Sequence, residues 1–597
     1  MKKLFIISVF IIFTFNLILA QNKLDAIYHY LKKEYTLTTS GELIYKYTKH
    51  QELITNKSYA RLFGETPIIY NTINDSLHFN YSYTINPDGD TIYTPFKEDP
   101  YKEYLPHEIN HSSIYNNYRE FIVHHLGLEP GAIIYFEYEK ITKNRNSLFT
   151  TIPLADFFPI DTYEIVVRIP ENKNIVYNVS NSNKFNKPII STENGYKVIK
   201  WKLHNIPLIE AESHHPDLTY FVPTLYLSTI QTWEDAKKLY ENILYANDNI
   251  DPALYKKFKQ NVEAVYKDFT LTNVVDYIKE YFDEVELSLE TCNFNLKSCN
   301  EVLQSMSGTI YDKQKLIVNI AKKEQWDNFF PILLTEKKIN KESPNLNSFD
   351  IAGFLNGSCE LKLINKELTE NPFHYKNYYI LPFKPNANIS LFKELKIFPE
   401  NLNIRKINKI FTITKSQKKP LCIKLKLNLE LQGIFDKDIK TLKNEIKSLV
   451  KGNMTNFSYF TKDNITKIIA DFDSIKFDSI SNKIFSFNPN IFKYKLNEFL
   501  LPERNIPVKT KDFIHKEYTK IKYDNGIDIL NLFNNIKIDS PFSNYSKNIH
   551  KNKKDLIIEK YFEIKTNIIN PNDYKKIRKS VINFSQDLKT QIYFKVK

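Results

Sequence analysis

Short runs of alternating apolar and polar residues, separated by turn signals, fill the first part of the chain. Residues 76–85 alternate in this way, and the turn-forming sequence of residues 86–90 follows them. A second tight turn at residues 128–131 leads into an apolar run at residues 132–138. Two-residue periodicity between turns is typical of strands with one buried face. The pattern predicts an antiparallel β-sandwich over residues 21–227.

Helical periodicity begins at Thr232, which is a suitable N-cap because Glu234 and Asp235 follow in the first turn. The helical pattern extends to about residue 266, and further helices are predicted over residues 273–282 and about 310–323. An apolar run at residues 330–334 then predicts the first strand of a sheet. Helices followed by strands indicate a central α+β domain over residues 228–390.

The pattern changes again after residue 391. Residues 421–431 alternate almost without interruption and predict a long, half-buried strand. Residues 438–451 form an amphipathic helical pattern that ends before Gly452. Near the C-terminus we expect a strand at 556–564, a helix at 571–584 and a strand at 591–596. Residues 391–597 therefore form a predicted C-terminal mixed β-rich domain, with no period that indicates a solenoid.

The first twenty residues have the pattern of a secretory signal. Lys2 and Lys3 precede the apolar run of residues 4–19, and Ala20 is a small residue before the expected cleavage. The mature chain then begins at Gln21, and no cysteine follows the cut to carry a lipid anchor. No later stretch is long and apolar enough to span a membrane. We expect an exported protein of the periplasm or the cell surface.

Composition indicates a folded, basic, multidomain chain. Aromatic residues make up 14% of the 597 residues, and the formal net charge is +13, or +11 after removal of Lys2 and Lys3. A basic chain favours acidic partners such as an anionic glycan, although a solvated basic surface explains the charge equally. Because no basic run is interleaved with aromatics, and because the chain is expected to be exported, nucleic acid is not an expected partner. An envelope protein is the other partner that we consider.

A six-residue motif opens the predicted helix at 310–323. Its sequence is Gly308-Thr309-Ile310-Tyr311-Asp312-Lys313. It resembles the Gly-x-Cys-x-Asp-Lys motif of the transglutaminase-like superfamily, in which the cysteine at the start of a buried helix is the nucleophile. The resemblance spans about residues 228–390 and implies a papain-like α+β core. Gly308, Asp312 and Lys313 are retained, whereas Ile310 occupies the position of the nucleophile and has nothing to ionise.

The resemblance also implies a histidine in a Phe-x-His run on the second strand after the motif helix. The nearest match is Phe349-Asp350-Ile351, so Ile351 occupies the histidine position. The first domain is similar to a domain of unknown function that precedes such cores in exported bacterial proteins. The similarity depends on Tyr70-Asn71, Pro87-Asp88-Gly89, Tyr118-Arg119, residues 128–131 and residues 223–226, just before Thr232-Trp233. Together these features imply a pseudoenzyme that acts as a binding or scaffold protein and uses no cofactor.

Two enzymatic alternatives remain open. Cys359 and His374 form the one thiol–imidazole pair that a relocated acyltransferase or peptidase site would use, although no helix N-terminus is expected at Cys359. Ser307 and Thr309 are hydroxyl nucleophiles with no base in view. Otherwise Cys359 is interpreted as a buried thiol and His374 as a surface histidine.

The remaining candidates also have a structural interpretation. Asp312 and Lys313 either line a retained ligand pocket or have structural roles, with Asp312 helping the helix to start and Lys313 reaching the surface. His107 and His111 have helical metal-ligand spacing but no third ligand, and His214-His215 is expected in a loop. The chain has no predicted metal site.

Cys292 and Cys299 are close enough in sequence to pair. The 39 tyrosines are enough to form a glycan-binding face, which sequence alone cannot locate.

Overall fold

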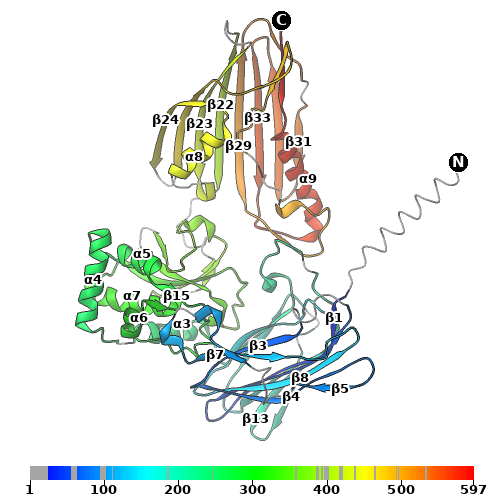
Figure 1. Cartoon of the computed structure of the whole chain (residues 1–597), viewed down its shortest axis with the longest axis vertical. Coiled ribbons are helices and arrows are strands. Elements are labelled where there is room, and N and C mark those ends of the chain that lie inside the picture. The colour runs from blue at the N-terminus through cyan, green and yellow to red at the C-terminus, as the bar shows by residue number, and fades with distance from the viewer. Residues whose placement is uncertain are drawn as a thin grey trace, which may run out of the picture.

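The computed structural model describes residues 24–597 except for short internal segments, which are 56–62, 95–101, 110–111, 183–184, 186, 211, 247, 357–359, 385–388, 392–393, 395–402, 416–420, 436–438, 463–464, 493, 495–496 and 532–533. The predicted signal sequence, His111, Cys359 and Asp438 lie outside the described residues. The chain is a β-rich, multidomain protein with several sheets. Figure 1 shows a β-rich N-terminal part, a central part that carries most of the helices, and a long C-terminal sheet.

An eight-stranded sheet organises the N-terminal part. Its strands, in spatial order, are β12 (Ile189–Glu193), β13 (Tyr196–Ile206), β10 (Ile160–Pro170), β1 (Ala26–Leu37), β2 (Leu43–Leu53), β8 (Ile133–Thr142), β4 (Asp75–Ile85) and β5 (Thr91–Tyr93). The predicted strand at 76–85 is β4, and the predicted turn closes with a hydrogen bond from Asn86 N to Asp90 O. The expected purely antiparallel pairing is wrong at one place, because β1 and β10 are parallel. The long connection between these two strands permits that pairing.

Two small sheets cover one face of the large sheet. One contains β11 (Val176–Ser180), β14 (Thr224–Ser228) and β9 (Phe149–Pro153), and the other contains β3 (Glu65–Asn71), β7 (Tyr118–His124) and β6 (Lys102–Tyr104). Leu225 of β14 packs with Ile165 and Val167 of the large sheet. Ile68 of β3 packs with Phe136 of β8 in a second core. The first domain is therefore layered, with its apolar residues between the sheets.

The opposite face of the large sheet carries a row of aromatic rings. Tyr30, His50, Tyr135, Tyr83 and Tyr93 are directly paired across the adjacent strands β1, β2, β8, β4 and β5. Their successive ring centroids are 5.3, 4.6, 4.9 and 5.7 Å apart. Because the rings pack mainly on one another, the row stabilises the solvent-facing side of the sheet.

Five helices follow, and the starts of two of them, α3 and α7, agree with the sequence pattern. They are α3 (Trp233–Leu244), α4 (Pro252–Tyr266), α5 (Leu271–Tyr281), α6 (Cys299–Ser305) and α7 (Ile310–Glu324). The side chain of Thr232 caps α3 by accepting a hydrogen bond from Asp235 N, as expected. The predicted helical stretch up to residue 266 is in fact two helices, because α3 ends at Leu244 and Asp251 caps α4.

These helices pack on one face of a five-stranded antiparallel sheet. Its order is β19 (Leu361–Leu363), β18 (Ile351–Asn356), β17 (Phe329–Thr335), β20 (Tyr379–Pro382) and β21 (Ser390–Leu391). The buried side chain of Gln314 joins α7 to the sheet, since its Nε2 donates to Ile332 O at 3.0 Å and to Gly353 O at 2.9 Å. Tyr240 of α3 donates to the Oε1 of Gln314 at 2.9 Å. Helix α7 is thereby fixed in register over β17 and β18.

A second eight-stranded sheet organises the C-terminal part. Its order is β24 (Asn453–Lys462), β25 (Ile465–Asp473), β23 (Cys422–Gln432), β22 (Ile404–Thr414), β29 (Phe513–Tyr523), β33 (Asp555–Ile564), β32 (Ser543–Lys551) and β31 (Ile536–Asp539). Strand β23 buries every second residue, as the alternation at 421–431 predicts. Strands β22 and β29 are parallel, which the sequence did not indicate.

One face of this sheet is covered and the other is open. The covering elements are α8 (Ile439–Leu449), α9 (Pro571–Asp587) and a small sheet of β26 (Asp478–Ser481), β27 (Ile484–Phe487), β35 (Ile592–Val596) and β30 (Ile527–Ile529). Lys509 N donates to His214 O at 2.7 Å, and Arg504 Nε lies 3.0 Å from Glu212 Oε2. The C-terminal domain thus contacts the loop before β14. No helix within the described part of the chain has the length and apolar character that a membrane crossing requires.

Candidate functional site

A capping box builds the start of α7. The side chain of Thr309 accepts a hydrogen bond from Asp312 N at 3.1 Å, and the Asp312 carboxylate accepts one from Thr309 N at 2.8 Å. A Cβ atom at Gly308 would lie 3.1 Å from the Cβ of Asp312, so a larger residue would crowd the box. Gly308 and Asp312 therefore shape the helix start, in agreement with the structural interpretation of Asp312.

Ile310 is the first residue of α7, and only 8% of its surface is exposed. It packs in the hydrophobic core that α7 shares with the neighbouring helices and with one face of the sheet. A helix N-terminus stabilises an anion such as a thiolate. An aliphatic side chain offers no such group, so this position has no nucleophile.

Ile351 lies on the other side of the sheet. Along β18, Ala352 and Phe354 belong to the core that contains α7, whereas Ile351 and Leu355 belong to a separate core on the opposite face. Successive side chains of a strand point to opposite faces, which explains this division. The structure therefore does not bring Ile351 against the side chain of Ile310.

The start of β18 is nevertheless close to the start of α7. Tyr311 Oη donates a hydrogen bond to Phe349 O at 2.7 Å. A shift of the strand register would not supply an imidazole there, because residues 348–352 contain no histidine. The motif at residues 308–313 and the stretch at residues 349–351 are thus adjacent in space. Neither stretch contains a cysteine or a histidine.

A tyrosine from the first domain completes the surroundings of Asp312. Tyr115, in the short helix η2 (Ser113–Tyr115), donates its hydroxyl to Asp312, and Lys297 N donates to the second carboxylate oxygen at 2.8 Å. The Oγ atoms of Ser112 and Ser307 form a further hydrogen bond of 2.7 Å. Burial and the adjacent Asp312 charge raise the pKa of Tyr115 well above its ordinary value, so the phenol remains a donor.

Lys313 does not reach the surface, and that expectation is wrong. Its side chain is fully buried, and its Nζ donates to Phe282 O at 3.2 Å and lies 3.9 Å from Glu284 Oε2. The ammonium group of Lys313 lies against Phe282 and Glu284, at the junction of α5 and β15 (Asp283–Glu284), rather than in solvent. Burial lowers the pKa of Lys313 to about 8, and Glu284 partly opposes that shift.

An acidic cavity of about 450 Å³ lies beside Ile351. Its lining contains five carboxylates, a single lysine and four uncharged residues, namely Glu284, Glu286, Glu336, Asp350, Glu367, Lys366, Ile351, Asn365, Leu368 and Tyr378. Burial raises the pKa of Asp350, although Lys337 lies 3.6 Å away. Ile310 does not line this cavity. The described residues of its lining thus offer charge and hydrogen-bonding groups, and none of them is a cysteine or a histidine.

A second cavity, of about 380 Å³, continues from the first toward the C-terminal domain. The two share Glu336, Glu367, Leu368 and Tyr378 in their linings. His374 lines the second cavity, where partial burial and the nearby Lys511 lower its pKa. It lies in a short 3-10 helix rather than on the sheet. Its proposed partner Cys359 is outside the described residues, so that pair has no observed geometry.

The thiols near α7 are structural. Cys292 and Cys299 are both buried and both free, so the disulfide that their spacing allowed is not formed. Burial, followed by the nearby Asp248 charge, raises the pKa of Cys299 to about 12. Burial and Asp312 also raise the pKa of Cys292. Neither thiol is ionised at neutral pH, and neither lies at the motif position.

The other histidine candidates are only partly described by the structure. His107 is exposed, and His111 is outside the described residues. His214 and His215 lie in a loop, as expected, and His215 Nδ1 donates to Pro216 O at 2.7 Å. Across the described ranges, no three residues of His, Cys, Asp or Glu are grouped so that they could hold a metal ion.

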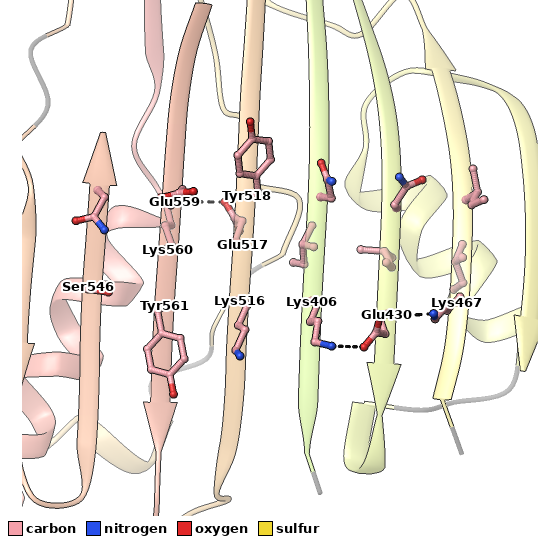
Figure 2. A pocket seen from close by; sticks show the side chains of 17 residues that line it. Lys406, Glu430, Lys467, Lys516, Glu517, Tyr518, Ser546, Glu559, Lys560 and Tyr561 are labelled. Atoms are coloured by element: carbon pink, nitrogen blue, oxygen red, sulfur yellow. Dashed lines mark hydrogen bonds and ion pairs between the residues drawn. The ribbon is translucent and has the colours of Figure 1, made fainter. Parts of the chain in front are cut away.

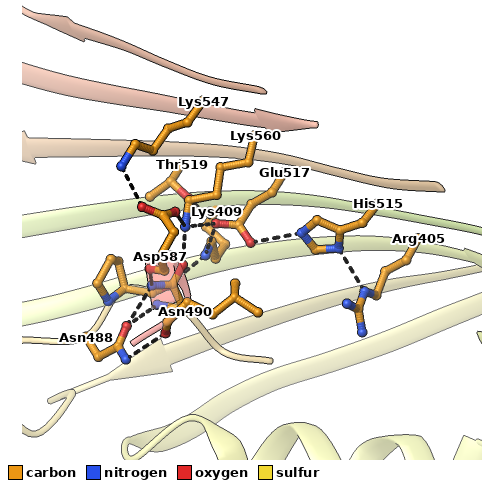
Figure 3. A network of polar contacts seen from close by, with 12 residues as sticks. Arg405, Lys409, Asn488, Asn490, His515, Glu517, Thr519, Lys547, Lys560 and Asp587 are labelled. Atoms are coloured by element: carbon orange, nitrogen blue, oxygen red, sulfur yellow. Dashed lines mark hydrogen bonds and ion pairs between the residues drawn. The ribbon is translucent and has the colours of Figure 1, made fainter. Parts of the chain in front are cut away.

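The sequence pattern missed a network of buried charges in the C-terminal domain (Figure 3). Lys409 Nζ donates to Glu517 Oε1 at 2.9 Å and to Pro489 O at 2.7 Å. Lys560 lies 2.7 Å from Asp587 and 3.6 Å from Glu517. Lys547 donates to Asp587 at 2.6 Å. These contacts link β22, β29, β33 and β32 to the end of α9 and to the segment that contains Pro489.

A neutral histidine connects this network to an arginine. Arg405 Nε donates to His515 Nδ1 at 3.0 Å, and His515 Nε2 lies 3.3 Å from Glu517 Oε2. Since arginine can only donate, Nδ1 accepts and the proton of His515 is on Nε2. Burial and the Arg405 charge lower the pKa of His515 to about 4, and burial lowers that of Lys409 to about 8. The signal in the sequence was that Lys409, His515 and Glu517 occupy inward positions of alternating strands.

Models of two known domain families match the chain, one in its N-terminal part and one in its C-terminal part. The family model of DUF3857, a domain of unknown function with a solved structure, matches residues 40–210. The model of DUF3858, described in the same way, matches residues 482–594. The chain carries a DUF3857 domain and a DUF3858 domain. The DUF3858 match does not include β22, β23 and β25, which belong to the same eight-stranded sheet.

A solved structure shares the fold over nearly the whole chain. It is that of a "putative protease" from Parabacteroides distasonis, with a TM-score of 0.68 and 16% identity, covering 96% of this chain and 99% of that one. A "putative nutrient binding protein" from Legionella pneumophila matches with a TM-score of 0.17 and 9% identity, over 50% of this chain and 94% of that one, and is too dissimilar to inform the fold. No curated protein matches the chain.

Proposed function

We propose that the protein is an exported, catalytically silent transglutaminase-like protein that acts by binding. The observation that carries this proposal is Ile310 at the first position of α7, where the motif Gly308 to Lys313 sets the register. The order of helices, motif helix and antiparallel sheet also fits such a core. Acyl transfer through a thioester requires a thiolate at this place, and a hydrocarbon cannot supply one.

The solved structure called a "putative protease" is compatible with this proposal. A shared fold at 16% identity supports a common architecture for the two chains. Function resides in the groups of a site rather than in a fold. A protein can keep a protease-like architecture and lose the reaction once its nucleophile is replaced.

The two contiguous cavities support a role in binding. They remain open beside the start of β18 and together provide carboxylates, amides, tyrosines and several lysines. A concave site with a few polar groups is the usual form of a ligand site. We therefore assign the central domain the recognition of an envelope protein or a glycan rather than a reaction.

The test is an activity assay on the mature chain from Gln21 onward. Fluorogenic acyl-transfer and peptidase substrates should give no turnover above buffer, with or without a thiol-blocking reagent. Turnover that the reagent abolishes would refute catalytic silence. Cleavage after Ala20 and recovery from an envelope or extracellular fraction test the export that the N-terminal sequence suggests.

A relocated thiol–imidazole pair is the second candidate. The observation in its favour is that His374 lines the second cavity. If Cys359 were the nucleophile, Cys359→Ala would abolish any turnover, whereas Cys292→Ala would leave it unchanged. Activity that survives Cys359→Ala would remove this candidate.

A further inference from the structure

The open face of the C-terminal eight-stranded sheet is hollowed into a trough of about 700 Å³ (Figure 2). Six neighbouring strands form its floor, from β25 through β23, β22, β29 and β33 to β32. The face points away from α8 and α9, which cover the other side. With strands about 4.8 Å apart, a row of side chains across the floor is roughly 24 Å long.

Two such rows follow from the strand register. The first contains Lys467, Glu430, Lys406, Lys516, Tyr561 and Ser546, each directly opposite the next. The second contains Ile469, Asn428, Asn408, Tyr518, Glu559 and Asn548, paired in the same way. The trough therefore has one cationic row beside one row rich in amides.

The charges of the first row do not balance. Three of its first four residues are lysines, and Glu430 is the single carboxylate among them. Glu430 pairs with Lys406, and its other oxygen lies 3.9 Å from Lys467. No carboxylate among the described residues lies within ion-pair distance of Lys516, whose Nζ is 5.8 Å from the centre of the Tyr561 ring.

Lys406 and Lys516 occupy directly opposite positions on the central parallel pair of strands. Like charges in opposite positions on adjacent strands destabilise a sheet, and an anion that contacts both would relieve the repulsion. Both side chains are exposed on the floor of the trough. Since Glu430 already pairs with Lys406, the uncompensated positive charge at the middle of the first row is that of Lys516.

The neighbouring groups indicate what carries the anion. Asn408, Asn428 and Asn548 offer amides that both donate and accept hydrogen bonds, as sugar hydroxyls require. Tyr518 and Tyr561 offer partly exposed rings on which the C–H faces of a sugar pack. A straight row with an even spacing favours a linear polymer with a regular repeat over a folded protein surface.

We propose that this trough binds a linear, carboxylate-bearing polysaccharide. A uronate carboxylate lies between Lys406 and Lys516, sugar rings contact Tyr518 and Tyr561, and hydroxyls bond to the asparagine amides. The inference goes beyond the proposed function, because it adds a binding place on the C-terminal sheet, separate from the cavities of the central domain, and names a ligand class for it. It does not depend on the chemistry at Ile310.

The experiment measures binding of the full mature chain to three polymers by isothermal titration calorimetry. They are oligogalacturonate, a neutral gluco-oligosaccharide of the same length, and poly-L-glutamate of the same charge. We expect binding to oligogalacturonate, which weakens with salt, and at least tenfold weaker binding to the other two. Equal binding to poly-L-glutamate would show general attraction of polyanions and would overturn the proposal, as would no binding to oligogalacturonate.

Variants locate the site. Lys406→Gln combined with Lys516→Gln should weaken oligogalacturonate binding at least tenfold, and Tyr518→Ala should weaken it severalfold. Lys522→Gln, an exposed lysine of the same strand and face, and Tyr459→Ala, an exposed tyrosine on β24, are the matched controls. Controls that lose as much affinity as the trough variants would place the binding elsewhere and refute the proposal. Because no turnover is measured, activity at α7 would leave this result unchanged.

Discussion

Tyr115 and Asp312 are 197 residues apart in the sequence, and the hydroxyl of the first donates to the buried carboxylate of the second. The bond joins the DUF3857 part of the chain to the first turn of α7. Around it, Ile109, Tyr118, Val285 and Cys292 form a small apolar core that also spans the two parts. The first domain thus packs against the start of α7.

Tyr115→Phe should destabilise this junction. The substitution removes a donor from a buried carboxylate, and a hydrogen bond to a charged group contributes about 1.5–3 kcal/mol. Tyr118→Phe is the matched control, because Tyr118 Oη donates to the neutral carbonyl of Thr291 at 3.2 Å. Thermal unfolding should show a larger fall in midpoint for Tyr115→Phe. Equal midpoints for the two variants would contradict the special role of the pair.

Stability should fall with acidity between pH 6.5 and about 4. His515 is neutral in the folded chain, with its pKa lowered to about 4, whereas the pKa of an unfolded histidine is near its ordinary value of 6.5. In this window the unfolded state binds the proton and the folded state does not, so stability is present above pH 6.5 and is lost as the pH falls. The charged groups that face the ring are Arg405, Glu517 and Lys560. The expected loss is roughly 3 kcal/mol.

His515→Gln tests this assignment. Urea unfolding of the variant should depend less on pH between 6.5 and 4.5 than that of the wild type, while the decline below pH 4.5 persists because the pKa of Glu517 is also lowered. His550→Gln, an exposed site on β32, should keep the wild-type dependence. An unchanged slope in His515→Gln would assign the acid sensitivity to other groups.

Two lysines on opposite faces of β22 should respond very differently to removal. Lys409→Met leaves Glu517 buried without its closest cation, and breaking such a pair costs about 3–5 kcal/mol. Lys406→Met breaks an exposed pair with Glu430, which is worth about 0–1 kcal/mol. Urea midpoints measure both. Similar losses in the two variants would show that the network of Figure 3 is not a stabilising core.

The buried thiols should resist alkylation. With its pKa raised to about 12, Cys299 has roughly a thousandfold less thiolate at neutral pH than an ordinary cysteine. Iodoacetamide labelling followed by peptide mass mapping should modify Cys292 and Cys299 only after unfolding, and Cys422, which is partly exposed, in the folded chain. Rapid labelling of Cys299, or a disulfide between Cys292 and Cys299, would contradict the structure.

Local patterns in the sequence predicted local structure well. Thr232 caps α3, the motif helix begins at Ile310, and residues 421–431 form most of β23. In each case the signal lies within a few consecutive residues, because caps and alternating faces are set by nearest neighbours.

Non-local pairing could not be predicted in the same way. A lysine in a strand is normally assigned to the solvent face, so the burial of Lys409 required knowledge of what covers the sheet. The burial of Lys313 depends on the chain between α5 and β15, and the docking of Tyr115 depends on a segment almost 200 residues away. The trough exists only through the register of six strands, of which β22 and β29 are parallel.

The most direct test of catalytic silence is the intact mass of the mature chain after incubation with an activated acyl ester. An active cysteine would accumulate a thioester and add one acyl group to the mass. We expect no acyl adduct on the buried Cys292 or Cys299 of the wild type, labelling limited to the partly exposed Cys422, and no turnover of the ester. An acyl adduct in the wild type that peptide mapping assigns to one cysteine, together with turnover of the ester, would contradict the account.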